Sequence, residues 1–353
     1  MLSRKKINDK YKKICWIIFS LVLACLTVTT VIKQSEGVSL SDIVHTVMKA
    51  DKTWLIVAII SASMFIICEG FAVMCILKGA GYKIKFKNGL LYSTSDIFFS
   101  AVTPSATGGQ PASAFFMLRD GIPAGVVTAT LIINLMLYTL SVVILGFIAV
   151  LMYPAAFFEF RIFSRVLISG GFAVLCGLSA FFLLMLKNGE KIFLVAFRIL
   201  MFFYKKRLIK RPDSMVSRLR KAKMDYRQCA KIVVKKPMIL LYSLFWNLLQ
   251  RFTQLIVPML LYISMGGHFK EAIMVFQRQC LVTVGFNFVP IPGAMGVADY
   301  LMVDGFSEIV GRELAFHLEM LSRSLTFYIC VSASGIFTLF GFLLGRRRND
   351  RSI

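Results

Sequence analysis

The sequence predicts an all-α polytopic membrane protein with about six full spans and two oppositely oriented re-entrant helical hairpins. Of its 353 residues, 58% are hydrophobic and only 17% are charged, whereas a soluble domain is nearer half apolar and a quarter charged. Several apolar runs reach the length of about 20 residues that a helix needs to cross a hydrocarbon core. These runs are continuous rather than alternating, which favours helices over a barrel.

The six runs that predict full spans are residues 14–32, 54–77, 124–151, 165–186, 238–263 and 321–344. The first of them follows a basic N-terminus, as the apolar region of a signal peptide does. It is longer than such a region and no small-residue cleavage site follows it, so we expect an uncleaved span.

Lysine and arginine are concentrated in four segments, 3–13, 78–87, 204–236 and 346–348. By the positive-inside rule these segments are cytoplasmic, and so are both termini. We therefore expect a multi-pass protein of the bacterial cell (inner) membrane. Residues 189–204 are typical of an interfacial helix on the inner leaflet.

The net charge of +23 also suggests nucleic acid as a partner. The basic residues lie between apolar runs, however, and not on a globular domain, so we expect contact with the anionic inner leaflet and no direct binding of nucleic acid. Eight cysteines lie mostly inside apolar segments without a CxxC pair. They predict small buried residues rather than disulfides or a zinc site. No residue spacing predicts a metal, a cofactor or a catalytic group.

Two further apolar segments, 88–121 and 271–310, are each interrupted near the middle, by "TPSATGGQP" and "VPIPGAMG". Each half is marginal in length for a span. The chain is then one flippase-like membrane domain: a first half (14–186) with the hairpin 88–121, a basic cytoplasmic segment (187–236), and a second half (237–345) with the hairpin 271–310.

Paired Gly/Pro interruptions that enter from opposite faces are typical of an inverted-repeat transporter, whose site lies between the tips. The alternative is that each interruption is a kink or an ordinary loop. Glycine allows a free turn or a close approach, and the amides at a restarted helix favour an anion such as phosphate. The tip residues that we expect to bind or shape the site are Gly108, Gly109, Gln110, Gly293 and Gly296, with Pro104, Pro111, Pro290 and Pro292.

Three ionisable residues lie inside apolar segments, namely Glu69, Arg251 and Arg278. Charges at such depth normally face a partner or a cavity. In a structural interpretation Glu69 pairs with Arg251 or Arg278 and fixes the bundle. In a functional one, both arginines hold a lipid phosphate while Glu69 contacts a cationic headgroup or balances charge. The two interpretations are compatible.

Arg251 also belongs to a polar stripe with i, i+3, i+4, i+7 spacing: Asn247, Gln250, Arg251 and Gln254. Such a stripe cannot face lipid, so it packs against polar groups or lines a path. Three aspartates flank the hairpins, and as helix-end carboxylates they predict structural roles: Asp96, Asp299 and Asp304.

At "TPSATGGQPASAFFMLRDG" and "VPIPGAMGVADY" the chain resembles the lysylphosphatidylglycerol synthase transmembrane family, the flippase-like membrane domain of the multiple peptide resistance factor. The matching residues are Pro104, Gly108, Gly109, Gln110 and Pro111, then Pro290, Pro292, Gly293, Gly296 and Asp299. The chain departs from the family pattern at Ala294, where glycine is common, and at Asp299, where glutamate is usual.

The resemblance implies translocation of a phospholipid, or of an aminoacylated phospholipid such as lysyl-phosphatidylglycerol, between leaflets. One alternative is a phosphatidylglycerol lysyltransferase or its membrane subunit, with a role in resistance to cationic antimicrobial peptides. Another is a permease for a different amphiphile. Full-length lysyltransferases carry a soluble domain that takes lysine from charged tRNA, and we expect any such activity to require a separate aminoacyl-transferase protein.

Overall fold

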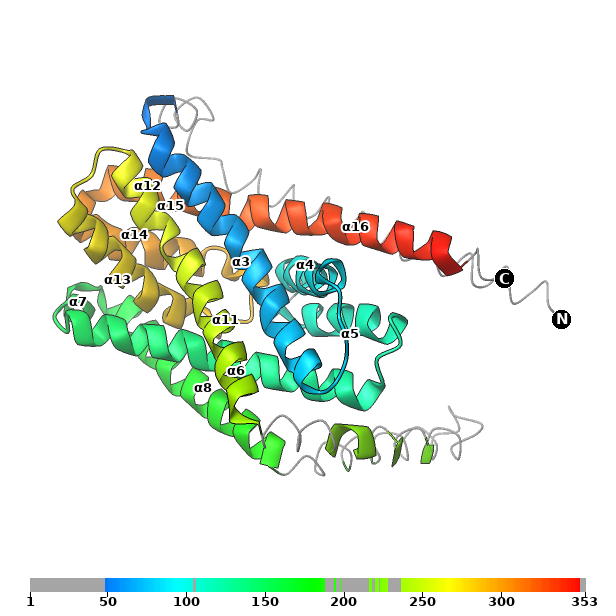
Figure 1. Cartoon of the computed structure of the whole chain (residues 1–353). Coiled ribbons are helices and arrows are strands. Elements are labelled where there is room, and N and C mark those ends of the chain that lie inside the picture. Colours follow the sequence, from blue (N-terminus) through cyan, green and yellow to red (C-terminus); the bar gives the residue numbers. More distant parts are fainter. Residues whose placement is uncertain are drawn as a thin grey trace. The chain divides into compact units, whose positions relative to one another are not determined.

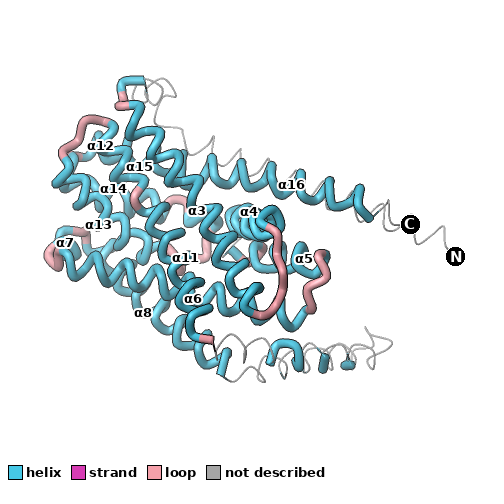
Figure 2. The backbone as a smooth tube through the Cα atoms, viewed as in Figure 1, coloured by secondary structure: helices cyan, strands magenta, loops and turns pink. Residues whose placement is uncertain are grey.

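The computed structural model describes residues 48–103, 106–187 and 236–349, together with isolated helical residues between 194 and 227. Within these residues the secondary structure consists of helices joined by turns and loops, without a strand (Figure 2). This confirms the predicted all-α class. The predicted span 14–32, and most of the basic segment 187–236, lie outside the described residues.

Among the described residues, four helical runs are long and apolar enough to cross a membrane. They are α3 (Lys52–Gly79), α6 (Ala124–Met152), α8 (Ile162–Lys187) and a continuous run from Arg312 to Leu343. They coincide with four of the predicted spans: 54–77, 124–151, 165–186 and 321–344.

The predicted span 238–263 is divided into two helices. α11 (Pro237–Leu255) is followed, after Ile256, by α12 (Val257–Ser264). Pro258 lies in the first turn of α12. Proline has no N–H to donate and its ring clashes with the carbonyl four residues earlier, so a continuous α-helix ends before it. The proline thus changes one predicted span into two shorter helices.

The last run begins at Arg312, earlier than the predicted residue 321. It comprises α15 (Arg312–Arg323), the π-helical segment η3 (Ser324–Ile329) and α16 (Cys330–Asn349). Residues 312–323 carry both acidic and basic side chains. Hydropathy alone therefore does not show that they continue into the apolar helix that follows.

The first interrupted segment forms two helices that pack together, α4 (Phe86–Val102) and α5 (Gly109–Arg119). We call them, with the residues between them, the first hairpin. Pro111 is the third residue of α5, in the first turn of the helix, where backbone N–H groups have no acceptor within the helix. Pro104 lies outside the described residues.

The second interrupted segment also forms a packed pair, α13 (Phe269–Phe286) and α14 (Val297–Val310), with the short 3-10 helix η2 (Pro292–Ala294) between them. We call this part the second hairpin. Each predicted interruption therefore separates two helices. Their re-entrant insertion from opposite faces stays a prediction.

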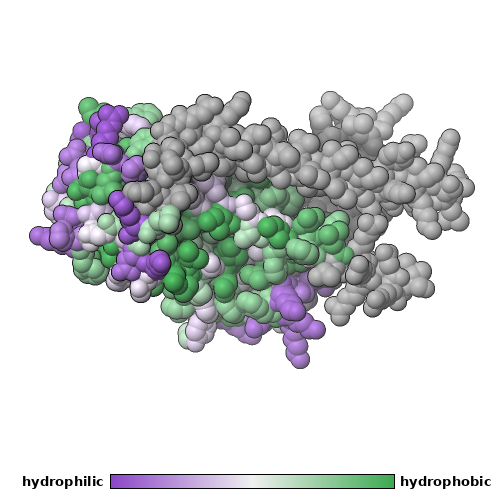
Figure 3. Space-filling model, turned by 90° about the horizontal axis from the view of Figure 1, so that it is seen from above, coloured by the Kyte–Doolittle hydropathy of each residue, from purple (hydrophilic) through white to green (hydrophobic). Residues whose placement is uncertain are grey.

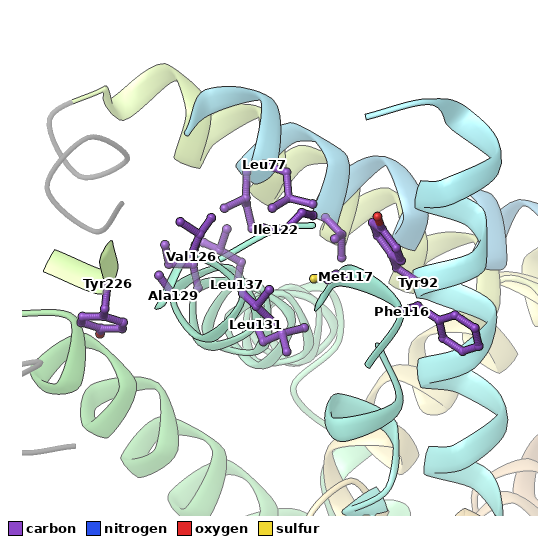
Figure 4. Close-up of a cluster of buried hydrophobic side chains, with 14 of the residues drawn as sticks. Leu77, Tyr92, Phe116, Met117, Ile122, Val126, Ala129, Leu131, Leu137 and Tyr226 are labelled. Carbon is purple, nitrogen blue, oxygen red and sulfur yellow. The ribbon is translucent and has the colours of Figure 1, made fainter. Parts of the chain in front are cut away.

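The helices of both hairpins pack against longer helices. α3 lies along α11 and contacts α4 and α6, while α13 contacts α6 and α8 (Figure 1). A buried apolar cluster joins α3, α4, α5 and α6 (Figure 4); its members include Leu77, Tyr92, Met117, Ile122 and Leu137. Close van der Waals packing of these side chains fixes the first hairpin against α3 and α6.

Large apolar side chains also remain exposed along the long helices. Figure 3 shows wide apolar areas, in green, on the face seen from above. Exposed examples are Ile56, Ile60, Phe147, Leu184 and Phe340. Soluble monomers rarely expose continuous apolar surface of this kind, whereas lipid tails can cover it. The surface and the four runs support a multi-pass membrane location.

Candidate functional site

The polar stripe on α11 turns inward, as its spacing predicts. Asn247, Gln250 and Arg251 are all buried, with exposed fractions of 0%, 1% and 6%. The Asn247 side chain donates to Asn134 Oδ1 on α6 at 3.2 Å, and Gln250 Nε2 donates to Glu69 Oε2 on α3, also at 3.2 Å. The stripe therefore connects three helices through polar contacts.

Glu69 meets a second buried carboxyl group, that of Asp96 on α4. The two carboxyl groups lie in hydrogen-bonding contact, and both residues are buried. Asp96 also accepts hydrogen bonds from Gln110 Nε2 at 3.0 Å and from Ser100 Oγ at 3.2 Å. The predicted helix-end position of Asp96 is wrong, because the residue lies inside α4, where its carboxyl accepts a hydrogen bond from Gln110 of α5.

We call Glu69, Asp96, Gln110, Gln250 and Arg251 the central cluster. Its members come from α3, α4, α5 and α11. Four of its five residues were candidate site residues in the sequence, and the structure brings these four together with Asp96.

Gly109 lets α5 approach the central cluster closely. A Cβ atom at this position would lie 2.0 Å from Asp96 Oδ1 and 2.0 Å from Ser100 Oγ. The backbone of Gly109 is helical and has no positive φ, so close approach is the reason for glycine here. The neighbour that approaches is the protein's own Asp96, which lies against the first turn of α5.

Arg251 is held by aromatic rings and an amide. Its guanidinium lies over the Tyr138 ring at 4.2 Å and near the Phe65 ring at 5.0 Å, and its Nη1 donates to Gln254 Oε1 at 2.7 Å. Among the described residues, no ion pair joins Arg251 to Glu69 or Asp96. Arg251 supplies positive charge to the two carboxyls at a distance, without forming a salt bridge with either.

Several buried polar atoms of this region have no hydrogen-bond partner among the described residues. They are three acceptors and one donor: Gln110 Oε1, Asn247 Oδ1, Gln250 Oε1 and Arg251 Nε. A buried polar group without a partner costs about 1–3 kcal/mol. Such atoms are expected where a ligand or water completes a site.

Arg278 is not brought to the central cluster. It is buried on α13, where it pairs with Glu159 of the short helix α7 (Ala156–Glu159), and its Nη1 donates to Gly305 O at 2.8 Å. The alternative in which Glu69 pairs with Arg278 is therefore wrong. The arginine that faces Glu69 is Arg251.

A second group of charges lies at the second hairpin. Arg323 of α15 forms an ion pair with Asp299 of α14, at 2.9 Å between Nε and Oδ1, and its Nη2 donates to Gly293 O at 3.0 Å. Glu319, one turn earlier on α15, contacts the Asp299 carboxyl. We call Asp299, Glu319 and Arg323 the tip cluster. It contains two acids and one arginine, as the central cluster does.

The backbone around the tip cluster has little freedom. Gly293 adopts φ 59°, and a Cβ atom there would lie 2.4 Å from the Phe327 ring. Before α14, the N–H of Gly296 donates to Asp299 Oδ2 at 2.8 Å. In the first hairpin, the N–H of Gly108 donates to Thr103 Oγ1, also at 2.8 Å. The amides of Gly108 and Gly296 are therefore occupied by protein oxygens.

The second hairpin reaches the region of the central cluster. η2, which begins at Pro292 just after Pro290, packs against α4. Tyr138 of α6, whose ring lies against the Arg251 guanidinium, forms a hydrogen bond with Asn287 at the end of α13. The linking segment of the second hairpin thus contacts the elements that build the central cluster.

Sequence reasoning gave Asp96 only a structural role and missed two buried charged residues, Glu319 and Arg323. The last two follow i, i+4 spacing inside a helix, in "HLEMLSRSL". That spacing puts both charges on one helix face. The pattern was missed because the predicted span begins at residue 321, after Glu319.

The described cysteines are free thiols, and Cys68, Cys280 and Cys330 are buried as predicted, whereas Cys176 is exposed. Among the residues with a described position, no group of three or more His, Cys, Asp or Glu side chains is placed to bind a metal ion.

A scan against protein-family models matches residues 16–334 to the family described as "Lysylphosphatidylglycerol synthase TM region". The match includes both hairpins and both clusters. A search of curated proteins and a search of solved structures each find no match.

Proposed function

Because the chain belongs to the lysylphosphatidylglycerol synthase transmembrane family, we propose that it moves a phospholipid between membrane leaflets. The family supports a role in membrane lipid metabolism or transport. The proposed substrate is a phospholipid or an aminoacylated phospholipid such as lysyl-phosphatidylglycerol, and the proposed membrane is the bacterial inner membrane.

The observation that carries this proposal is the chemistry of the central cluster. Among the described residues, it offers an unpartnered donor at Arg251 Nε and unpartnered acceptors at Gln110 Oε1 and Gln250 Oε1. Asn247, on the same face of α11, adds a third unpartnered acceptor, and all four atoms are buried. A headgroup with a phosphate and an amine presents the complementary acceptors and donors. In this proposal Arg251 holds the phosphate, since guanidinium groups bind phosphate through a fork of N–H groups, and the carboxyl pair faces the amine.

The proposed mechanism depends on the two hairpins. We infer that they are re-entrant and enter from opposite faces, so that the central cluster lies near the membrane midplane where their ends meet. The acyl tails would stay in the lipid beside the exposed apolar surface while the headgroup passes the cluster. Gly108, Gly109, Gly293 and Gly296 would keep the backbone close to this path.

Leaflet exchange in liposomes tests the proposal. The purified chain is reconstituted with fluorescent phosphatidylglycerol or fluorescent lysyl-phosphatidylglycerol, and exchange is measured by dithionite quenching. We expect exchange well above that of protein-free liposomes, and its loss in Arg251→Met. Glu313→Gln, which removes an exposed charge at the start of α15, is the matched control and should retain exchange. Wild-type protein that exchanges neither lipid would contradict the proposal.

The orientation is tested separately with single cysteines in a background without other cysteines. His268→Cys, between α12 and α13, should react with an impermeant maleimide from outside. Lys85→Cys, before α4, should react only after permeabilisation. Labelling of both cysteines from the same side would contradict the proposal that the two hairpins enter from opposite faces.

The family description also favours a second candidate, phosphatidylglycerol lysyltransferase activity alone or with a partner protein. Transfer of radiolabelled lysine from charged tRNA to phosphatidylglycerol, assayed with the purified chain and with membranes that contain it, distinguishes the two. Labelled lipid from the purified chain would establish synthesis. Labelled lipid only from membranes would indicate a separate transferase partner.

A further inference from the structure

The carboxyl groups of Glu69 and Asp96 contact each other in a buried environment, with residue exposures of 7% and 9%. Two ionised carboxylates in contact repel each other. A hydrogen bond can form between them only when one of them holds a proton. The pair then titrates as a unit, with one shared proton. The contact therefore favours a shared proton over two ionised carboxylates.

The charges around the pair support this conclusion. On the described helices packed against α3 and α4, the charged group that acts on both carboxyls is Arg251 of α11. With both acids ionised, the cluster would hold two negative charges and one positive charge. One proton makes the cluster neutral, which is the state that burial favours.

A second observation shows what could replace the proton. Gln250 is 1% exposed; its Nε2 donates to Glu69, and its Oε1 has no partner among the described residues. An acceptor beside the carboxyl pair fits a cation that donates hydrogen bonds. A primary ammonium has three such donors and carries the same charge as the proton.

We propose that Glu69 and Asp96 form a proton site, and that a lipid ammonium occupies this site in exchange for the proton. This inference rests on the proposed lipid translocation and names its coupling ion. In the exchange, the O–H bond of the protonated carboxyl breaks and its proton passes to water. The resulting carboxylate then accepts hydrogen bonds from the ammonium, and no other bond changes. A lipid without an amine leaves the proton in place.

Proton release on binding tests the exchange without any transport. Lysyl-phosphatidylglycerol in detergent micelles is added to the purified full chain in weak buffer that contains a pH indicator. We expect release of about one proton per lipid bound, and none with phosphatidylglycerol. Glu69→Gln should release none, and Asp96→Asn is a second variant if Glu69→Gln does not fold. Glu313→Gln is the matched control with wild-type release. Binding of the aminated lipid without proton release overturns the proposal.

Liposomes that hold a pH-sensitive dye separate this inference from the proposed function. A pH difference of about one unit across the membrane should change wild-type exchange of lysyl-phosphatidylglycerol several-fold and should leave exchange of phosphatidylglycerol unchanged. Exchange that is independent of the pH difference, without lipid-dependent proton movement, overturns the proton site only. The absence of both binding and exchange overturns the proposed function and the proton site together.

Discussion

The central cluster and the tip cluster contain the same charged groups, two acids and one arginine, but these groups are connected differently. In the tip cluster Arg323 pairs directly with Asp299 and donates to the backbone of Gly293. In the central cluster Arg251 lies on aromatic rings and the two acids contact each other. Arg323 is thus bound to the second hairpin. Arg251 is held beside two acids by aromatic rings, without an ion pair to either acid among the described residues.

From this difference we infer a structural role for the tip cluster and a binding role for the central cluster. A buried ion pair with backbone contacts fixes the geometry of a hairpin, and its removal leaves an uncompensated charge. An arginine on aromatic rings keeps its charge available to a ligand. We therefore expect the tip cluster to determine stability, and the central cluster to determine lipid binding.

The largest change in stability is expected at the tip cluster. Arg323→Met leaves the buried Glu319 and the partly buried Asp299 without the arginine between them. It should lower the free energy of unfolding by about 3–5 kcal/mol, measured by thermal unfolding in detergent. Arg323→Met combined with Asp299→Asn should recover part of the loss. If the single variant is as stable as the wild type, the tip cluster has no structural role and the comparison fails.

Gly109→Val should have the next largest effect. Its side chain would overlap Asp96 and Ser100, which a Cβ would already approach to 2.0 Å, and overpacking costs about 1–3 kcal/mol. We expect the protein to insert and to lose lipid exchange, because Asp96 must move. Gly177→Val is the control, since nothing lies within 4 Å of a Cβ at that exposed position of α8. Wild-type exchange in Gly109→Val would mean that Asp96 needs no fixed position.

Arg251→Lys sharpens the comparison at the central cluster. Lysine keeps the charge but loses the planar group that lies over Phe65 and Tyr138 and the fork that binds phosphate. We expect about tenfold slower exchange, equivalent to about 1.4 kcal/mol, with nearly unchanged thermal stability. A large loss of stability with retained exchange would assign Arg251 the role that we give to Arg323.

A substitution away from both clusters should have the smallest effect. Asp51 caps α3 by accepting a hydrogen bond from the N–H of Thr53 at 2.8 Å. Asp51→Ala should cost about 1 kcal/mol of stability and leave exchange unchanged. Slower exchange in this variant would show that the assay responds to stability alone.

Much of the fold could be predicted because long apolar runs leave few alternatives. α3, α6 and α8 follow directly from run length, and the inward face of α11 follows from the spacing of its polar residues. Each Gly/Pro interruption separates two helices for the reason expected, since proline and paired glycines oppose a continuous helix. The position of Pro258 was visible in the sequence, yet its effect was hidden by the apolar residues around it.

The partners of the buried charges could not be predicted. Glu159 lies on a short helix between two spans, and nothing in its sequence context indicates that it meets Arg278, which is far away along the chain. Asp96 has the same difficulty, because its contact with Glu69 depends on how α4 packs on α3. Pairing of this kind is a property of the packed helices and not of either segment.

The π-helical segment Ser324–Ile329 has a mechanical consequence. An α-helix turns by about 100° per residue, so a wider turn changes the angular phase between the parts on either side. Before it, α15 packs on α14 of the second hairpin; after it, α16 packs on α4 of the first. One continuous helix therefore contacts both hairpins. We expect a rotation of one hairpin relative to the other to be taken up at the wide turn, where the regular hydrogen-bond pattern of the helix is interrupted.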